Sequence, residues 1–192
     1  MNKAAEAIDG ILKKHKTDEM SVENRLPASF YQRDVLEVAP DLLGKLLVVR
    51  RSDGLYYRFA ISEVEAYRGE EDKACHASRG RTPRTEVMYA SGGRIYVYFV
   101  YGMYWMLNIV AGKDNDPQAV LIRGLEGLTG PGRITRGLGI NGDFYGEDLV
   151  QSDRIWIEGP GEKSRFITSP RIGIDYSGSP WKEKKWLFVS EK

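Results

Sequence analysis

The sequence predicts an α+β fold, a single domain around a mixed, largely antiparallel, curved β-sheet with flanking helices. Three observations predict it. Strand-like segments follow one another through short turns, as in hairpins. Helical periodicity is confined to residues 4–16, residues 33–45 and one short stretch after residue 130. Helices and strands do not alternate strictly, as they would around a parallel sheet.

Length and composition are those of an ordinary globular protein. The 192 residues suffice for one domain with a substantial core, and 42% are hydrophobic and 29% charged. A net charge of +1 leaves nucleic-acid binding open, because binding depends on where the charges lie. Cys75, the single cysteine, has no internal disulfide partner, which fits a reducing compartment. The N-terminus lacks the apolar stretch of a secretory signal, so we expect a protein that is not secreted.

Residues 1–26 are interpreted as a polar N-terminal extension and residues 27–192 as the main domain. The extension carries five basic and five acidic residues. Its stretch "AAEAIDGILKKHK" places Ala5, Ile8, Ile11 and Leu12 on one side of a helix. We expect either a helix packed on the domain or a partly disordered tail.

The main domain begins with helical segments and a hairpin. "RDVLEVAPDLLGK", residues 33–45, is a helical pattern in which Pro40 is expected to start a second helix that ends at Gly44. "LLVVRR" and "YYRFAISEVEAY" are strands joined by the turn "SDGL". The polar connection that follows, residues 68–93, is long, and long ordered connections are often functional.

The later segments continue the sheet. "IYVYFVYGMYWMLN", residues 95–108, is predicted as a hairpin, and "AVLIRGLE", residues 119–126, as a strand. "GLTGPGRITRGLGI" contains a glycine-rich turn and a short helix. "RIWIEG", "RIGIDY" and "KKWLFV" are predicted as C-terminal strands.

Two acids lie on one face of the strand "ISEVEAY". Because side chains alternate along a strand, Glu63, Glu65 and Tyr67 share a face. One interpretation is an ordinary solvent-facing edge, since acids are mostly exposed. The other is a carboxylate held as a general base, whose pKa a second carboxylate nearby would raise.

The next connection is basic and contains His76. Arg79, Arg81 and Arg84 lie in a Gly/Pro-rich loop, either as a solvated loop or as phosphate contacts. With two histidines in the chain, no HExxH and no paired cysteines, a metal site is not expected.

The aromatic stretch, residues 95–108, holds four tyrosines, Phe99 and Trp105. A membrane span would have tyrosines at its ends rather than throughout, and would have to satisfy Asn108 in lipid, so we expect no span. As a hairpin, the stretch has one apolar face and one face with Tyr98 and Asn108, while Tyr101 lies at the turn. Such a surface suits a base-stacking pocket with a wedge, since stacking on an aromatic is worth about 1–3 kcal/mol per base.

Taken together, these motifs resemble the alkyladenine (3-methyladenine) DNA glycosylase family. The resemblance rests on "EVEAYRGEEDKACHASRGRTPR", "IYVYFVYGMYWMLN" and "AVLIRGLE", and continues through "GPGRITRGLGINGDFYGEDL" and "PRIGIDYSG". It covers about residues 27–192. Two departures are a loop after His76 that is one residue shorter than in the mammalian branch, and Thr85 where Asn is usual.

The resemblance implies a role for each matching residue. Glu65 matches the general base that activates water, and Arg123 the arginine that helps place that water. The residues that enclose the flipped base would be Tyr67, His76 and Tyr98, with Asn108 crowding the amino group of normal guanine. DNA contacts would come from Tyr101, inserted into the duplex, and from Met103, Arg79, Arg81, Arg84 and Arg133, with Arg136 as an alternative phosphate contact.

The implied enzyme removes alkylated or otherwise damaged purines from double-stranded DNA and leaves an abasic site. No lysine lies in the pocket motif, so a monofunctional enzyme without a Schiff base is expected, and no cofactor or metal is implied. We expect a monomer in the cytoplasm, at the bacterial nucleoid, or in a eukaryotic nucleus. Two other interpretations stay open, a non-catalytic nucleic-acid-binding module and a glycoside hydrolase that uses Glu63 and Glu65. The range of lesions and the role of residues 1–26 do not follow from the sequence.

Overall fold

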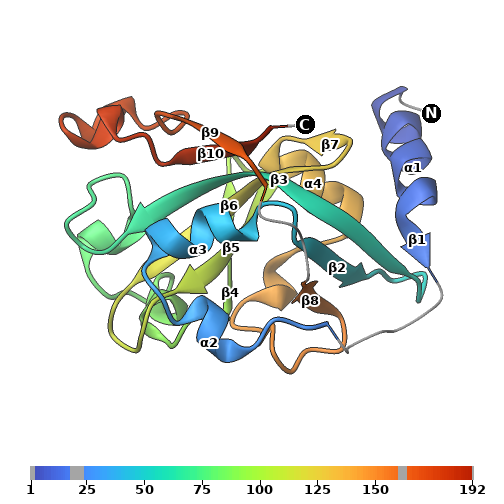
Figure 1. The fold of residues 1–192 in the computed structure, drawn as a ribbon, viewed down its shortest axis with the longest axis horizontal. Helices are drawn as coiled ribbons and strands as arrows, with labels where there is room; N and C mark the ends of the chain where they lie inside the picture. Colours follow the sequence, from blue (N-terminus) through green and yellow to red (C-terminus); the bar gives the residue numbers. More distant parts are fainter. Residues whose placement is uncertain (1–2, 18–23, 160–163, 192) are drawn as a thin grey trace.

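A computed structural model describes residues 3–17, 24–159 and 164–191 as one α+β domain around a ten-stranded sheet (Figure 1). The helices are α1 Lys3–His15, α2 Ala28–Tyr31, α3 Val35–Leu42 and α4 Pro131–Leu138, with 3-10 turns η1 His76–Arg79, η2 Glu86–Tyr89, η3 Gly142–Phe144, η4 Asp175–Ser177 and η5 Trp181–Glu183. The strands are β1 Lys16–Thr17, β2 Leu46–Arg50, β3 Tyr56–Arg68, β4 Ile95–Val100, β5 Tyr104–Ala111, β6 Gln118–Leu125, β7 Leu128–Thr129, β8 Ile155–Glu158, β9 Phe166–Ser169 and β10 Leu187–Ser190. All strand pairs among the described residues are antiparallel, which confirms the predicted class.

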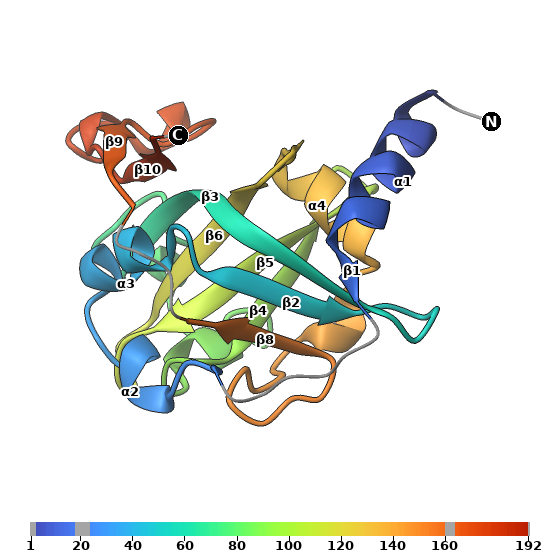
Figure 2. The same cartoon turned by 45° about the vertical axis from the view of Figure 1, so that its right-hand side comes forward.

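Strand β3 is the centre of the sheet. Its first half pairs with β2, which in turn pairs with β8 (Figure 2). Its second half lies between β6 and β10, with Glu65 opposite both Leu121 and Leu187. This carboxylate therefore lies on a central strand, away from the edges of the sheet.

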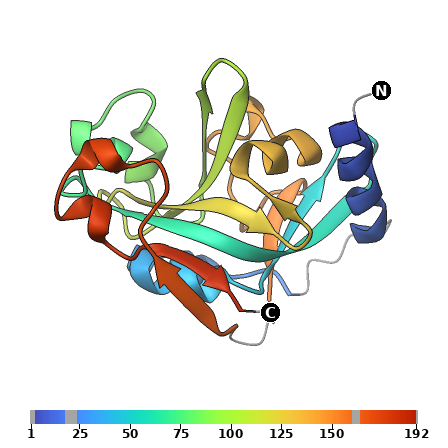
Figure 3. The ribbon, with the colours of Figure 1, turned by 90° about the horizontal axis from the view of Figure 1, so that it is seen from above.

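The aromatic stretch is the predicted hairpin. Tyr96 lies opposite Asn108 and Tyr98 opposite Met106 across β4 and β5. The turn contains Tyr101 at φ 53° followed by Gly102 at φ 65°, a left-handed pair that reverses the chain tightly. Figure 3 shows this turn projecting away from the rest of the sheet.

The N-terminal helix packs on the domain where it is described. Ile8 and Leu12 belong to the buried core, and His15 stacks on Phe59 at 4.2 Å between ring centroids. Residues 1–2 and 18–23 of the predicted extension lie outside the described residues. The division of the chain at residue 26 stays a prediction. Within the described residues, no helix is both long and apolar enough to cross a membrane.

Two predicted elements were wrong. Pro40 does not start a second helix but lies inside α3, which begins after the Asp34 cap and ends two residues beyond the proline. A proline near a helix end costs one backbone hydrogen bond, and its fixed φ is already helical. "RIGIDY" is a turn at Gly173, φ 75°, followed by η4. On the side of β10 away from β3, the pairing strand is the upstream segment β9.

Candidate active site

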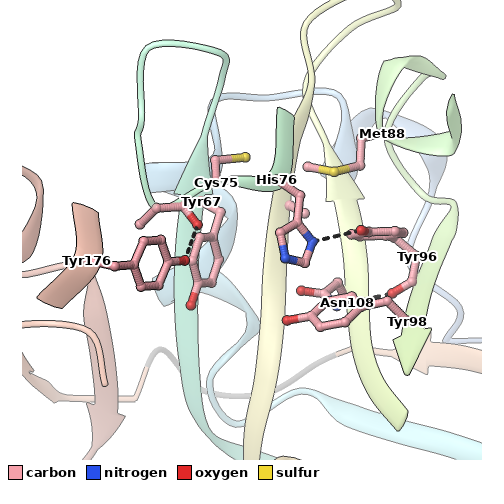
Figure 4. A pocket seen from close by; sticks show the side chains of 10 residues that line it. Tyr67, Cys75, His76, Met88, Tyr96, Tyr98, Asn108 and Tyr176 are labelled. Carbon is pink, nitrogen blue, oxygen red and sulfur yellow. Dashed lines mark hydrogen bonds between the residues drawn. The ribbon is translucent and has the colours of Figure 1, made fainter. Parts of the chain in front are cut away.

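A small cavity lies above the sheet where β3, β4, β5 and β6 run side by side (Figure 4). Its lining combines phenols, an imidazole, an amide and small apolar groups. These residues are Tyr67, Ala74, Cys75, His76, Met88, Tyr96, Tyr98, Asn108, Ala119 and Tyr176. The cavity volume is about 50 Å³.

The register of the sheet explains how distant residues reach this cavity. Glu65 lies opposite Leu121, Leu121 opposite Asn108, and Asn108 opposite Tyr96. Residues directly opposite one another on antiparallel strands place their side chains on the same face. One row across four strands therefore brings the acid, the amide and a phenol to one side of the sheet.

Glu65 is held by three partners and is fully buried. Its Oε2 accepts a hydrogen bond from the Tyr67 hydroxyl at 2.7 Å, and its Oε1 accepts one from the Ile172 amide at 2.7 Å. The Arg123 guanidinium lies 3.5 Å from Oε1. Burial raises the pKa of Glu65 above its ordinary value, although Arg123 and both hydrogen bonds act in the opposite direction.

Glu63 lies on the same face, as predicted, and shares Arg123. The Arg123 Nε donates to Glu63 at 3.0 Å. A Cβ at Gly124, the next residue of β6, would come within 2.8 Å of the Glu63 Cβ, so this close approach requires glycine. The two acids differ in burial, since the Glu63 side chain is 21% exposed and that of Glu65 0%.

The opposite wall is made of His76, Tyr96 and Tyr98. The Tyr96 hydroxyl and His76 Nδ1 are 2.8 Å apart, and the His76 and Tyr98 rings pack edge to face at 4.6 Å. Burial, together with Arg84 and Arg79, lowers the pKa of His76 to about 4. His76 is therefore neutral at physiological pH, and this wall carries no charge of its own.

Asn108 is fixed by the hairpin. Its Nδ2 donates to the carbonyls of Tyr96 at 3.1 Å and Met106 at 3.2 Å, and the residue is 3% exposed. Two backbone acceptors leave this amide little freedom to turn. The side chains at the hairpin tip are instead exposed to solvent, Tyr101 by 86% and Met103 by 55%.

The predicted arginines separate into distinct environments. Arg81 is paired with Glu86 through two hydrogen bonds of 2.6 and 2.8 Å. Arg84 lies over the Tyr98 ring at 5.0 Å. Arg79 and Arg84 line, together with Lys73, an open cleft of about 330 Å³ that adjoins the cavity. Arg133 follows the glycine turn at the start of α4.

Thr85, the departure from the family pattern, is a structural residue of this loop. It is buried, accepts a hydrogen bond from the Thr82 amide at 2.9 Å and donates to the Gly80 carbonyl at 3.1 Å. It thus closes the shortened loop on itself.

Several pocket residues were missed from the sequence. Tyr96 carried a signal, because strand alternation already placed it on the face of Tyr98. Tyr176, and Ile172 whose amide binds Glu65, carried none, because the alternating pattern of "RIGIDY" predicts a strand. In the described part of the chain, no group of three or more His, Cys, Asp or Glu residues is arranged to hold a metal ion.

Comparison with known proteins defines the class. The model of a family described as "Methylpurine-DNA glycosylase (MPG)" matches residues 29–130 and 126–192. The chain belongs to this family and is an enzyme of the DNA glycosylase class.

Proteins similar to this chain over most of its length carry names of the same class. A protein of Psychrobacter cryohalolentis is 41% identical over 86% of this chain and 91% of its own length. One from a Wolbachia of Culex pipiens is 44% identical over 86% of this chain and 89% of its own. One from the archaeon Methanocella arvoryzae is 42% identical over 82% of this chain and 90% of its own. Each bears the name "Putative 3-methyladenine DNA glycosylase".

Proposed function

We propose that this protein is a monofunctional 3-methyladenine-type DNA glycosylase of base excision repair. It flips a damaged purine out of duplex DNA and hydrolyses the N-glycosidic bond with a water that Glu65 activates. The observation that carries the proposal is the contact of Glu65 with both Arg123 and the pocket residue Tyr67. An acid that only stabilised the fold would not need to lie beside an aromatic cavity.

The reaction follows from the chemistry of the lesion. Alkylation at a ring nitrogen makes the purine cationic, so the base can leave with the electrons of the C1′–N bond. Water supplies the new C1′–O bond, and its proton passes to the Glu65 carboxylate. Because the pKa of Glu65 is raised by burial, its carboxylate is a stronger base than that of an exposed glutamate.

The pocket walls suit a flat cation. The ring of Tyr67 faces those of His76 and Tyr98 across the cavity (Figure 4), and phenol faces attract cations. A neutral His76 adds no repulsion toward a charged base. The Asn108 amide, fixed by two carbonyls, would collide with the exocyclic amino group of guanine and exclude this normal base.

One wall of the cavity is exposed, and this wall would move when the base enters. Tyr176 is the wall residue with the greatest exposure, 70%, and its hydroxyl is held by a single bond to the Ala74 carbonyl at 3.2 Å.

The hairpin tip would hold the duplex open. Tyr101 projects into solvent at the turn, and Met103 two residues later is also exposed. Both side chains could therefore contact DNA without any unfolding of the hairpin. Filling the gap left by a flipped base offsets the few kcal/mol that flipping costs.

The proposal is tested by incubating the protein with duplexes that each carry one 3-methyladenine, 7-methylguanine, ethenoadenine or hypoxanthine. We expect a free base and an alkali-labile abasic site from the cationic lesions at least. Borohydride should trap no covalent protein–DNA adduct, because Glu65 delivers water and, in the described part of the chain, no lysine lines the cavity to form a Schiff base. Binding without base release would favour a non-catalytic module, and sugar release from oligosaccharides would favour a glycoside hydrolase.

A further inference from the structure

A fully buried ion pair lies behind the site, outside the cavity lining. Arg171 Nη1 and Nη2 donate to the two carboxylate oxygens of Asp72 at 2.5 and 2.9 Å, and both side chains are 0% exposed. Asp72 belongs to the loop after β3, whereas Arg171 belongs to the segment between β9 and η4. The pair therefore joins two segments that are 99 residues apart in the sequence.

Other contacts of Arg171 lead to the acid end of the site. Its Nη1 also donates to the Ala66 carbonyl, one residue beyond Glu65, at 2.9 Å. Its guanidinium carbon lies 4.7 Å from the centroid of the Tyr67 ring and 5.0 Å from that of Trp186. The next residue, Ile172, provides the amide that binds Glu65.

Asp72 organises the loop that carries the opposite wall. Its carboxylate accepts the Ala74 amide at 3.0 Å and the Arg68 amide at 3.2 Å, and its carbonyl accepts the Cys75 amide at 2.8 Å. His76 follows directly. One pair thus fixes the Tyr67 ring, the Ile172 amide and the start of the His76 wall.

Stability alone is a weak reason for such a pair. Removing two charges from water is costly, and well-packed apolar residues often serve a core equally well. Charge close to the reaction centre is a stronger reason. An unpaired Arg171 behind Tyr67 would repel a cationic base on the other face of the ring, while Asp72 cancels that charge.

We propose that Arg171 and Asp72 form a charge-neutral positioning pair, which holds Tyr67 and the Ile172 amide against Glu65 without repelling a cationic purine. This inference rests on the proposed function. Neither residue contacts the base, so both act through their neighbours.

The first test is Asp72→Asn, which keeps the shape but leaves the Arg171 charge uncompensated. On 7-methylguanine duplexes, whose base is cationic throughout the acidic range, the acid limb of the single-turnover rate, where the rate falls as pH is lowered, should move to lower pH by about one pH unit. The extra positive charge favours the ionised Glu65. At pH values above the limb, release of 7-methylguanine should fall about tenfold relative to release of the neutral ethenoadenine.

The second test is the double variant Asp72→Asn/Arg171→Met, which removes both charges and leaves no unpaired ion. Its acid limb should move to higher pH, because Glu65 loses a stabilising cation, and its preference between the two lesions should return toward that of the wild type. Thermal unfolding by circular dichroism identifies folded variants. If Asp72→Asn does not fold, the double variant tests the inference by itself, through the direction in which its acid limb moves along the pH axis.

A merely structural pair would lower the rate without moving the limb or the lesion preference, and this result would overturn the inference. Movement of the acid limb in the same direction in both variants would also overturn the inference. Absence of base release by the wild-type protein would instead refute the proposed function, so the two failures are distinguishable.

Discussion

The acid end of the site and the tip of the β4–β5 hairpin are built in opposite ways. Glu65 has no exposed surface, and a hydroxyl, an amide and a guanidinium hold its carboxylate. Tyr101 is 86% exposed at a strained turn of positive φ, outside every core cluster of the described residues. Both regions belong to one sheet, within a few strands of each other.

The difference matches the roles that we propose for the two regions. A carboxylate that activates water needs fixed neighbours and a low dielectric constant, so burial in the middle of the sheet suits it. A side chain that enters a duplex has to reach beyond the protein surface before any contact forms. Changes at the acid end should therefore affect the chemical step, while changes at the tip should affect access to duplex DNA.

Apart from changes to Glu65 itself, the largest effect is expected for Arg123→Gln. Loss of this guanidinium removes the charge beside Glu65 and the link to Glu63, which raises the pKa of Glu65 further and removes one of the three partners of its carboxylate. Single-turnover release of 7-methylguanine should fall by about 10²-fold, the usual cost of one preorganised charged donor, with little change in duplex affinity. Equal loss of affinity and rate would place Arg123 in DNA binding instead.

Tyr101→Ala should come next. The change removes an exposed ring, so the fold should be unaffected, but the flipped state loses about 1–3 kcal/mol of stacking, or roughly 5- to 150-fold in rate on duplex DNA. Single-stranded DNA with the same lesion needs no wedge and should react almost as before. Comparing the two substrates is the measurement, and equal losses on both would contradict the wedge.

Asn108→Ala should change the rates less, and for undamaged guanine it should raise the rate of release rather than lower it. Without the amide, undamaged guanine enters the pocket more easily, and its slow release should rise about tenfold, as expected when one polar discriminating contact is lost. Release of 7-methylguanine should change less. The check is the ratio of the two rates, and an unchanged ratio would remove Asn108 from lesion discrimination.

The smallest effect is expected in the loop. Arg79→Gln removes a charge from the open cleft and should reduce the salt dependence of DNA binding. The slope of the logarithm of the DNA association constant against the logarithm of the salt concentration should become shallower by about one. Arg81→Gln is the matched control, because Arg81 is already neutralised by Glu86. Equal changes in slope for both variants would show that the Arg81 pair opens on DNA.

The sequence predicted most of the scaffold because its patterns are local. Strand alternation was enough to place Glu63, Glu65 and Tyr67 on one face, and to separate the apolar and polar faces of the aromatic hairpin. "RIGIDY" failed because Gly173 and a buried Arg171 override an apparently alternating pattern. The burial of Arg171 depends on its pairing with Asp72, which is 99 residues away and cannot be predicted from a local sequence pattern.

The site itself depended on register. The row that aligns Glu65 with Asn108 requires two strand pairings, β3 with β6 and β6 with β5, and pairing is decided by the whole sheet. The motifs supplied the residues through their resemblance to a known family, while the distances between these residues came from the fold alone. Tyr96 is the exception, since its place on the polar face was available from alternation.

The most direct test compares Glu65→Gln with Glu63→Gln. Both changes remove one carboxylate that contacts Arg123, but only Glu65 also binds Tyr67. Single-turnover release of 7-methylguanine should fall by about 10³-fold or more in Glu65→Gln, with binding to damaged duplex retained, and by far less in Glu63→Gln. The wild-type rate should decline as pH falls through a pKa above the ordinary glutamate value of about 4.3. Normal release by Glu65→Gln, or equal losses in the two variants, would contradict the assignment of Glu65 as the general base.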